Sequence, residues 1–191
     1  MKRTAILFAL ILASTLPAWA QSAEFGVIVG GSMRNIGSAP EFPGDPHLDD
    51  GFSFSNGSFD LYWSMPIDSD TNFRIKLGRI EGPVAFESVI EGDDTVYRRD
   101  VDGEVQHIAG IIDYRFDEAW GSTGIFGGVG LYRQTAPGFD SRSDYGFTAG
   151  LNGDFPLTRR FGVIAEVAYH WTRGDFDPRY LTAGAGMRVR F

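Results

Sequence analysis

The sequence predicts an all-β protein, an eight-stranded antiparallel up-and-down transmembrane barrel preceded by a cleaved signal peptide. Apolar side chains recur at every second residue, which is the period of a strand, and no segment shows a helical stripe. The predicted connections alternate between long and short. Charges of both signs lie on the face of the strands opposite the apolar one, as they do when lipid covers the outer wall of a barrel.

Residues 1–20 have the three parts of a secretory signal peptide. Lys2 and Arg3 are followed by the apolar run Ala5–Leu16 and then by the small residues Ala18 and Ala20. The run is shorter than the roughly 20 apolar residues that a spanning helix needs. Removing Lys2 and Arg3 changes the net charge from −8 to −10, so we expect an acidic domain over residues 21–191, exported to the bacterial outer membrane.

The composition excludes several classes of function. The chain has no cysteine, and therefore no disulfide, thiolate metal site or cysteine nucleophile. The excess of 25 acidic over 17 basic residues excludes the basic footprint of a nucleic-acid-binding protein. No phosphate-binding loop or metal-ligand motif is present, and we expect no cofactor.

The eight predicted strands span residues 24–35, 58–67, 72–84, 104–116, 122–134, 145–157, 161–173 and 179–191. The first and the fifth are less regular, because glycine blurs their alternation. In the second, apolar residues from Phe59 to Ile67 alternate with polar ones such as Asp60, and in the third Ile75 lies between Arg74 and Lys76. Each is about as long as a tilted membrane-crossing strand.

The later strands continue this pattern. The fourth opposes Ile108 and Ile112 to His107 and Asp113, and the sixth opposes an apolar face to a polar one. The seventh and eighth show it most clearly, with apolar faces made of Phe161, Val163, Ala165, Val167, Tyr169 and Trp171, and of Leu181, Ala183, Ala185, Met187, Val189 and Phe191.

The connections give independent support. Three are short, at Asp68–Thr71, Asp117–Gly121 and Thr158–Arg160. Between them lie four longer ones, at Ile36–Gly57, Ala85–Gly103, Thr135–Asp144 and Gly174–Pro178. Outer-membrane barrels place short turns in the periplasm and longer loops outside. Because lipid offers no hydrogen-bond partner to an open edge, we expect the last strand to pair with the first.

A soluble barrel of the lipocalin kind is the alternative fold. It would bury the apolar face, including Trp63, Phe147 and Phe191, in a narrow interior, and would expose the charged one. The charges favour the membrane barrel, in which Arg74, Glu166 and Arg188 point inward and Leu61, Ile75 and Val167 contact lipid.

The signal peptide, the eight strands and the ending Gly186-Met187-Arg188-Val189-Arg190-Phe191 resemble the small outer-membrane barrels of the OmpA and OmpX type. The resemblance covers all of the mature chain. It implies that Met187, Val189 and Phe191 form the signal read by the barrel-assembly machinery. Unlike OmpA-type proteins, the chain has no peptidoglycan-binding domain after the barrel, and we expect its function to reside in the barrel, its lumen and its loops.

The inward-facing charges are the main candidate site. We expect Glu166 to pair with Arg188 or Arg190, and Asp113 with Arg74, Lys76 or Arg115, with Asp60 on the same face. Losing one partner of a buried pair costs about 3–5 kcal/mol, so such pairs tend to plug a lumen. Eight strands leave an interior that side chains can fill, and a gated ion path is the alternative.

Three motifs point to other functions. His170 and Thr172, with Asp175 and Asp177, superficially resemble the catalytic sets of enzymes that modify lipid A, but Thr replaces Ser and His170 should face the lumen. Arg173-Gly174-Asp175 is a tripeptide of the integrin-binding type. The acidic stretches Asp45–Asp50 and Glu91–Asp102 could gather divalent cations, although they lack an EF-hand ligand set.

We therefore expect a structural or interaction role and no enzymatic activity. The predicted partners are outer-membrane lipid or lipopolysaccharide, the barrel-assembly machinery, and a surface ligand of the extracellular loops.

Overall fold

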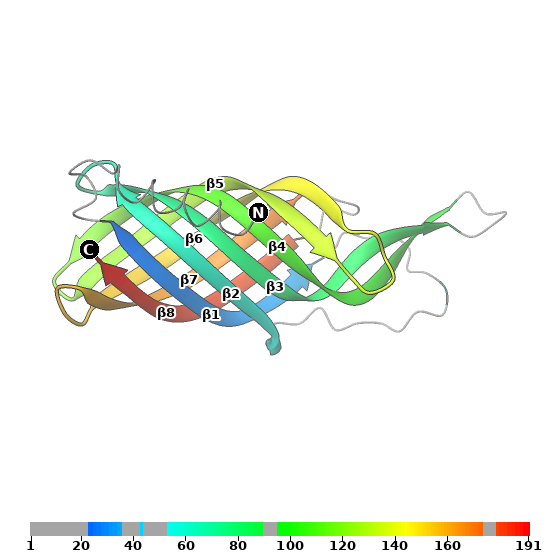
Figure 1. Ribbon diagram of the computed structural model, residues 1–191, viewed down its shortest axis with the longest axis horizontal. Coiled ribbons are helices and arrows are strands. Elements are labelled where there is room, and N and C mark those ends of the chain that lie inside the picture. The colour runs from blue at the N-terminus through cyan, green and yellow to red at the C-terminus, as the bar shows by residue number, and fades with distance from the viewer. Residues whose placement is uncertain (1–22, 36–42, 44–52, 90–94, 174–178) are drawn as a thin grey trace, which may run out of the picture.

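The computed structural model describes residues 23–35, 43, 53–89, 95–173 and 179–191, which form one closed antiparallel barrel (Figure 1). Its strands are β1 Glu24–Asn35, β2 Ser53–Pro66, β3 Thr71–Val89, β4 Val96–Glu118, β5 Gly121–Thr135, β6 Arg142–Pro156, β7 Phe161–Thr172 and β8 Arg179–Arg190. The predicted signal peptide at residues 1–20 lies outside the described part. Within that part, no helix has the length and apolar character needed to cross a membrane.

Each strand pairs with its neighbour in sequence, and β8 returns to β1, which confirms the predicted closure. The β1–β8 ladder runs without interruption from Glu24↔Arg190 to Asn35↔Arg179. Closure leaves the membrane-crossing strands without an open edge, as a hydrocarbon environment requires.

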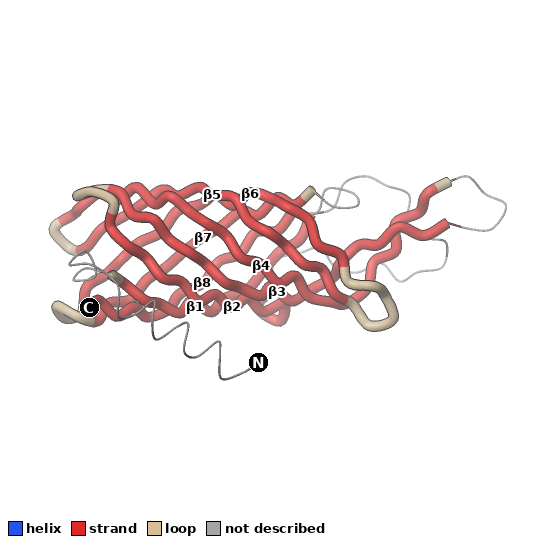
Figure 2. The backbone as a smooth tube through the Cα atoms, turned by 45° about the horizontal axis from the view of Figure 1, so that its top comes forward, coloured by secondary structure: helices blue, strands red, loops and turns tan. Residues whose placement is uncertain are grey.

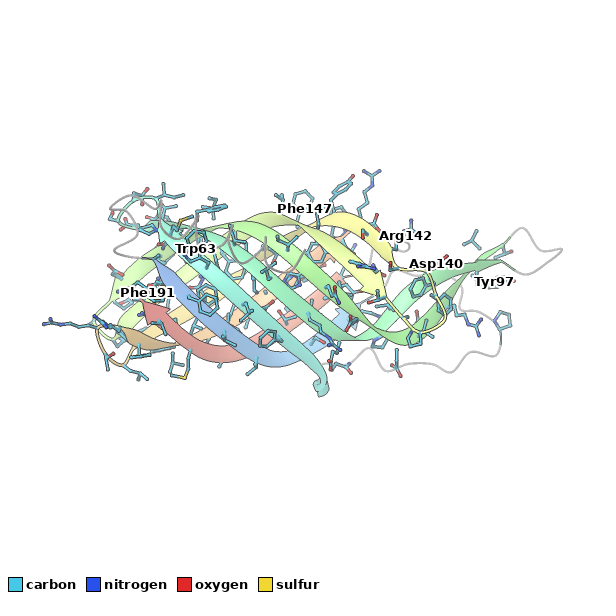
Figure 3. The ribbon with its side chains drawn as sticks, in the orientation of Figure 1. Trp63, Tyr97, Asp140, Arg142, Phe147 and Phe191 are labelled. Atoms are coloured by element: carbon cyan, nitrogen blue, oxygen red, sulfur yellow. The ribbon has the colours of Figure 1, made fainter. Side chains whose placement is uncertain are left out.

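The alternation of side chains across the wall confirms the predicted orientation. Arg74 and Arg188 are 0% and 2% exposed in the lumen, whereas Val167 and Leu131 are 45% and 63% exposed on the outer wall. Trp63 and Phe147 lie on the wall between the two ends of the barrel, and Phe191 lies near one end (Figure 3). An outer surface this apolar is stable only where lipid covers it.

The short turns lie together at one end of the barrel, near Phe191 (Figure 2). In the turn of residues 67–70, the Asp68 carboxylate accepts the backbone N–H groups of Asp70 at 3.0 Å and Thr71 at 2.7 Å. These hydrogen bonds lower the pKa of Asp68. The β6–β7 turn is stabilised in the same way, because Thr158 Oγ1 accepts a hydrogen bond from the Phe161 backbone N–H at 2.9 Å.

At the other end, two predicted connections are too long. β2 begins at Ser53, within the predicted connection Ile36–Gly57. The connection Ala85–Gly103 is not a long loop, because β3 and β4 continue as a paired hairpin to Val89↔Val96. The hairpin projects beyond the other strands (Figure 1). The acidic residues of this stretch suggested a solvated loop, but Val84 and Phe86 alternate along β3 and bury their side chains, which stabilises the ladder.

Candidate functional site

The lumen contains a balanced set of five carboxylates and five cations, contributed by seven of the eight strands. They are Glu24, Asp60, Asp113, Asp154 and Glu166, with Arg74, Lys76, Arg115, Arg188 and Arg190. Every second position of a strand faces the lumen because of the period-two alternation, so the tilt and stagger of the strands decide which inward residues meet.

The layer nearest the short turns surrounds Glu24 of β1. Its carboxylate contacts Arg115 of β4 at 3.0 Å and also pairs with Arg190 of β8. Arg188 donates from Nε to Asp154 at 2.6 Å, and Arg115 lies 3.5 Å from the same carboxylate. Two cavities of about 220 and 270 Å³ open beside this layer, and Arg190 lines both.

The middle layer surrounds Arg74 and Lys76 of β3, both fully buried. Arg74 donates to Asp113 at 2.5 Å and to Glu166 of β7 at 2.8 Å. Lys76 pairs with the same Glu166 and with Asp60 at 2.9 Å. Glu166 therefore joins the two cations across the lumen.

Aromatic and amide groups complete the middle layer. The Arg74 guanidinium lies 4.7 Å from the centre of the Tyr62 ring, a cation–π distance. Asn152 donates to Asp113 at 2.8 Å, which satisfies the carboxylate oxygen that Arg74 leaves free. The buried charges are thus compensated by both ion pairs and hydrogen bonds.

Above this layer lie two histidines and a tyrosine. His107 Nε2 lies 3.1 Å from Asp60, and His170 contacts Tyr132 at 3.1 Å and Thr182 at 3.4 Å. The two imidazole rings have centroids 5.0 Å apart.

A glycine makes the His107–Asp60 contact possible. Gly78 of β3 lies directly between the two residues, in register with Asp60 on one side and His107 on the other. A Cβ atom at Gly78 would overlap both the Asp60 carboxylate and the imidazole.

The loop end of the lumen is closed by apolar side chains. The buried cluster consists of Ile80, Val84, Phe86, Val105, Tyr132 and Tyr180. Phe139 of the β5–β6 loop stacks on Phe86 with ring centroids 4.5 Å apart. Arg34 of β1 and Asp100 of β4 form an ion pair of 3.0 Å that joins the projecting hairpin to the opposite wall.

One predicted pairing is wrong. Glu166 was expected beside Arg188 or Arg190, yet it pairs with Arg74 and Lys76. In the β7–β8 register, Glu166 lies opposite Gly184, four residues and therefore roughly 13 Å from Arg188. Asp113 has two of its three expected partners, Arg74 and Arg115.

Two of the ten residues, Glu24 and Asp154, were missing from the predicted site. Both share the inward face of their strands with predicted polar residues, and the alternation alone could have identified them. Glu24 was missed because glycines obscure the pattern of β1, whereas Asp154 was placed on the polar face of its strand but was given no partner.

The remaining candidates occupy different places. His170 is fully buried in the lumen, away from the lipid-facing wall, while Asp175 and Asp177 and most of the Arg173-Gly174-Asp175 motif lie outside the described residues. Among the described residues, no three His, Cys, Asp or Glu side chains converge as a metal site. Met187 and Phe191 are 57% and 69% exposed on the outer wall, with Val189 between them.

A closed eight-stranded barrel with a lipid-facing apolar wall and a charged interior defines the class of small outer-membrane β-barrel proteins. The sequence matches the family model of the outer membrane protein beta-barrel domain over residues 6–190, and the chain therefore belongs to this family. No curated protein sequence matches the chain.

Three solved structures share the fold. Neisserial surface protein A is 15% identical with a TM-score of 0.64, over 88% of this chain and 97% of that one. The attachment invasion locus protein Ail of Yersinia pestis is 18% identical with a TM-score of 0.53, over 90% and 99%. The N-terminal barrel of Pseudomonas aeruginosa OprF is 12% identical with a TM-score of 0.54, over 90% and 98%.

Proposed function

We propose that this protein is a non-conducting outer-membrane barrel without enzymatic activity, which acts through its structure and through contacts made at its loop end. The observation that supports this function is the filled lumen. Arg74, Lys76 and Asp113 are each 0% exposed in the centre of the barrel, and the apolar cluster around Phe86 and Tyr132 covers them toward the loops.

An ion crossing the barrel would have to displace these pairs. Separating a buried pair leaves a poorly solvated charge, at a cost of about 3–5 kcal/mol. The central cations are each held by two carboxylates, Arg74 by Asp113 and Glu166, and Lys76 by Glu166 and Asp60. We therefore expect the network to block the passage of ions rather than to conduct them.

Conductance of the purified protein in planar bilayers tests the closed lumen. We expect the current to stay at the level of a protein-free bilayer. Frequent discrete openings would contradict the proposal and support the narrow channel. Heat-dependent gel mobility of the same preparation serves as the control that the barrel is folded.

The loop end is proposed to contact positively charged surfaces. Residues 36–57 and 85–103 together contain ten Asp or Glu residues and two arginines. Among proteins of this fold, Ail has been crystallised with the heparin analogue sucrose octasulfate. The acidic composition here favours the opposite charge in a ligand, a basic peptide or protein.

Binding of polylysine and of dextran sulfate to cells displaying the protein tests this contact. We expect polylysine to bind, and to bind less when Asp93 and Asp94 are changed to Asn. The matched control changes Asp117→Asn and Glu118→Gln at the short-turn end. Equal binding by both variants, or a preference for dextran sulfate, would refute the acidic loop contact.

The buried position of His170 argues against lipid A modification. Its partners are Tyr132 and Thr182 inside the lumen, where no acyl chain reaches. We expect the lipid A mass of expressing cells to be unchanged. A mass shift that His170→Ala abolishes would revive the enzymatic function.

A further inference from the structure

Arginines occupy the loop-side boundary of the apolar wall. Four strands carry an exposed arginine at the first outward position on the loop side of the apolar wall. In one of them, this position lies just after the strand end. The arginines are Arg79 on β3, Arg133 on β5, Arg173 after β7 and Arg179 on β8. At the short-turn end, corresponding outward positions are taken by aromatic residues such as Phe155 and Phe161. The arginines on outward strand positions therefore gather at the loop end, whereas Arg159 and Arg160 at the other end lie in a turn.

The contacts of these arginines differ. Arg79 is compensated by Glu81 at 2.9 Å and by Glu104 at 2.7 Å. Arg173 lies over the Tyr145 ring and donates to its hydroxyl. Arg133, in contrast, donates to the neutral hydroxyl of Ser141 at 3.0 Å, which leaves its charge uncompensated among the described contacts.

Arg133 also lines a groove of about 520 Å³ on the outer wall. Its loop-side edge is polar and contains Gln106, Arg133 and Ser143, which are neighbours in register across β4, β5 and β6. Asp144 also lines the groove, and its carboxylate pairs with Arg142 at 3.4 Å. Two residues deeper in the membrane, the next outward row is apolar and consists of Leu77, Ile108, Leu131 and Tyr145. The groove thus joins a hydrogen-bonding edge with one cation to an apolar floor.

We propose that this groove binds a phosphorylated glycolipid of the outer leaflet, of the lipid A class. The phosphate pairs with the Arg133 guanidinium, whose planar fork suits two phosphate oxygens. Gln106 and Ser143 meet the sugar hydroxyls, and one acyl chain lies along Ile108 and Leu131.

Two features favour this occupant over a glycerophospholipid. The groove is at the loop end, and so faces the outer leaflet if the loops are outside. Its polar edge offers an amide and a hydroxyl beside the cation, which match a headgroup rich in hydroxyls. The site depends on the membrane orientation of the barrel but not on a closed lumen.

Native mass spectrometry of the detergent-released barrel, titrated with diphosphorylated lipid A, tests the site. We expect Arg133→Ala to weaken lipid A binding by about tenfold or more, the value of one charge-assisted hydrogen-bonded contact. Arg133→Lys should restore part of the affinity. The matched control is Arg159→Ala, which removes another exposed arginine, in the short turn of residues 157–160.

Three outcomes would overturn the proposal. Arg133→Ala and Arg159→Ala could bind lipid A equally well, dephosphorylated lipid A could bind as tightly as the phosphorylated form, or phosphatidylglycerol could match lipid A. Heat-dependent gel mobility checks that each variant is folded. Because none of these readouts involves current, failure here is distinct from failure of the closed-lumen proposal.

Discussion

Glu166 is the residue on which the central network most depends. It pairs with both Arg74 and Lys76, and both cations are 0% exposed. Glu166→Gln retains the shape of the side chain but removes its charge, which leaves Arg74 and Lys76 with one carboxylate each, Asp113 and Asp60. Removing one partner of a buried pair costs about 3–5 kcal/mol.

The structure places Glu166→Gln at the lower end of that range. Arg74 keeps Asp113, Lys76 keeps Asp60, and the glutamine carbonyl can still accept one hydrogen bond. We therefore expect the free energy of unfolding to fall by about 3 kcal/mol. Urea titration of the barrel in lipid, followed by heat-dependent gel mobility, measures it.

The control is Arg79→Gln, which breaks ion pairs at the surface. Its side chain is 53% exposed, and such pairs contribute about 0–1 kcal/mol. If Glu166→Gln costs no more than Arg79→Gln, the lumenal charges are hydrated rather than buried, and the argument for a plug fails.

Three further predictions concern other parts of the barrel. Gly78→Ala should force Asp60 and His107 apart and lower stability by roughly 1–3 kcal/mol, and an unchanged urea midpoint would show that the lumen has room to spare. Deletion of Phe191 should reduce the folded protein in the outer membrane far more than deletion of residues from the first long loop; normal assembly without it would refute its role as a signal. The backbone hydrogen bonds lower the pKa of Asp68 in the folded state, so the stabilisation they give is present above the unfolded pKa and is lost as pH falls through the folded one; an NMR titration of Asp68 that shows an ordinary pKa would contradict this turn geometry.

The sequence predicts most of the wall because one rule governs it. In lipid, backbone groups must pair and outward side chains must be apolar, so a period of two and the alternating connections suffice to place the eight strands. The same rule places the inward face of β3, with Arg74 and Lys76, but it cannot say how far a hairpin continues into water. Beyond the membrane, water can pair with backbone groups, so the alternation does not fix where a strand ends. In the structure, the extended hairpin packs Phe86 against Phe139.

The partners inside the lumen could not be predicted for a geometric reason. Glu166 was predicted to pair with an arginine of the neighbouring strand. Residues that meet across a narrow barrel belong instead to strands distant in sequence, such as β3 and β7. Their meeting depends on strand tilt and stagger, which alternation does not encode. Eight of the ten lumenal charges were predicted even where the pairs were not, because the inward face of a strand follows from the alternation of its side chains.

The order of the side-chain layers along the barrel axis relates these charges to the proposed function. Ion pairs fill the half near the short turns, histidines and Tyr132 lie above them, and an apolar cluster closes the half near the loops. Cavities beside Arg190 and Arg115 open from the short-turn end, so water at that end can reach the nearest charges. An ion entering from that end would meet balanced pairs and then the apolar cluster. This order of layers supports the proposal that the interior stabilises the barrel and that contacts are made at the loop end.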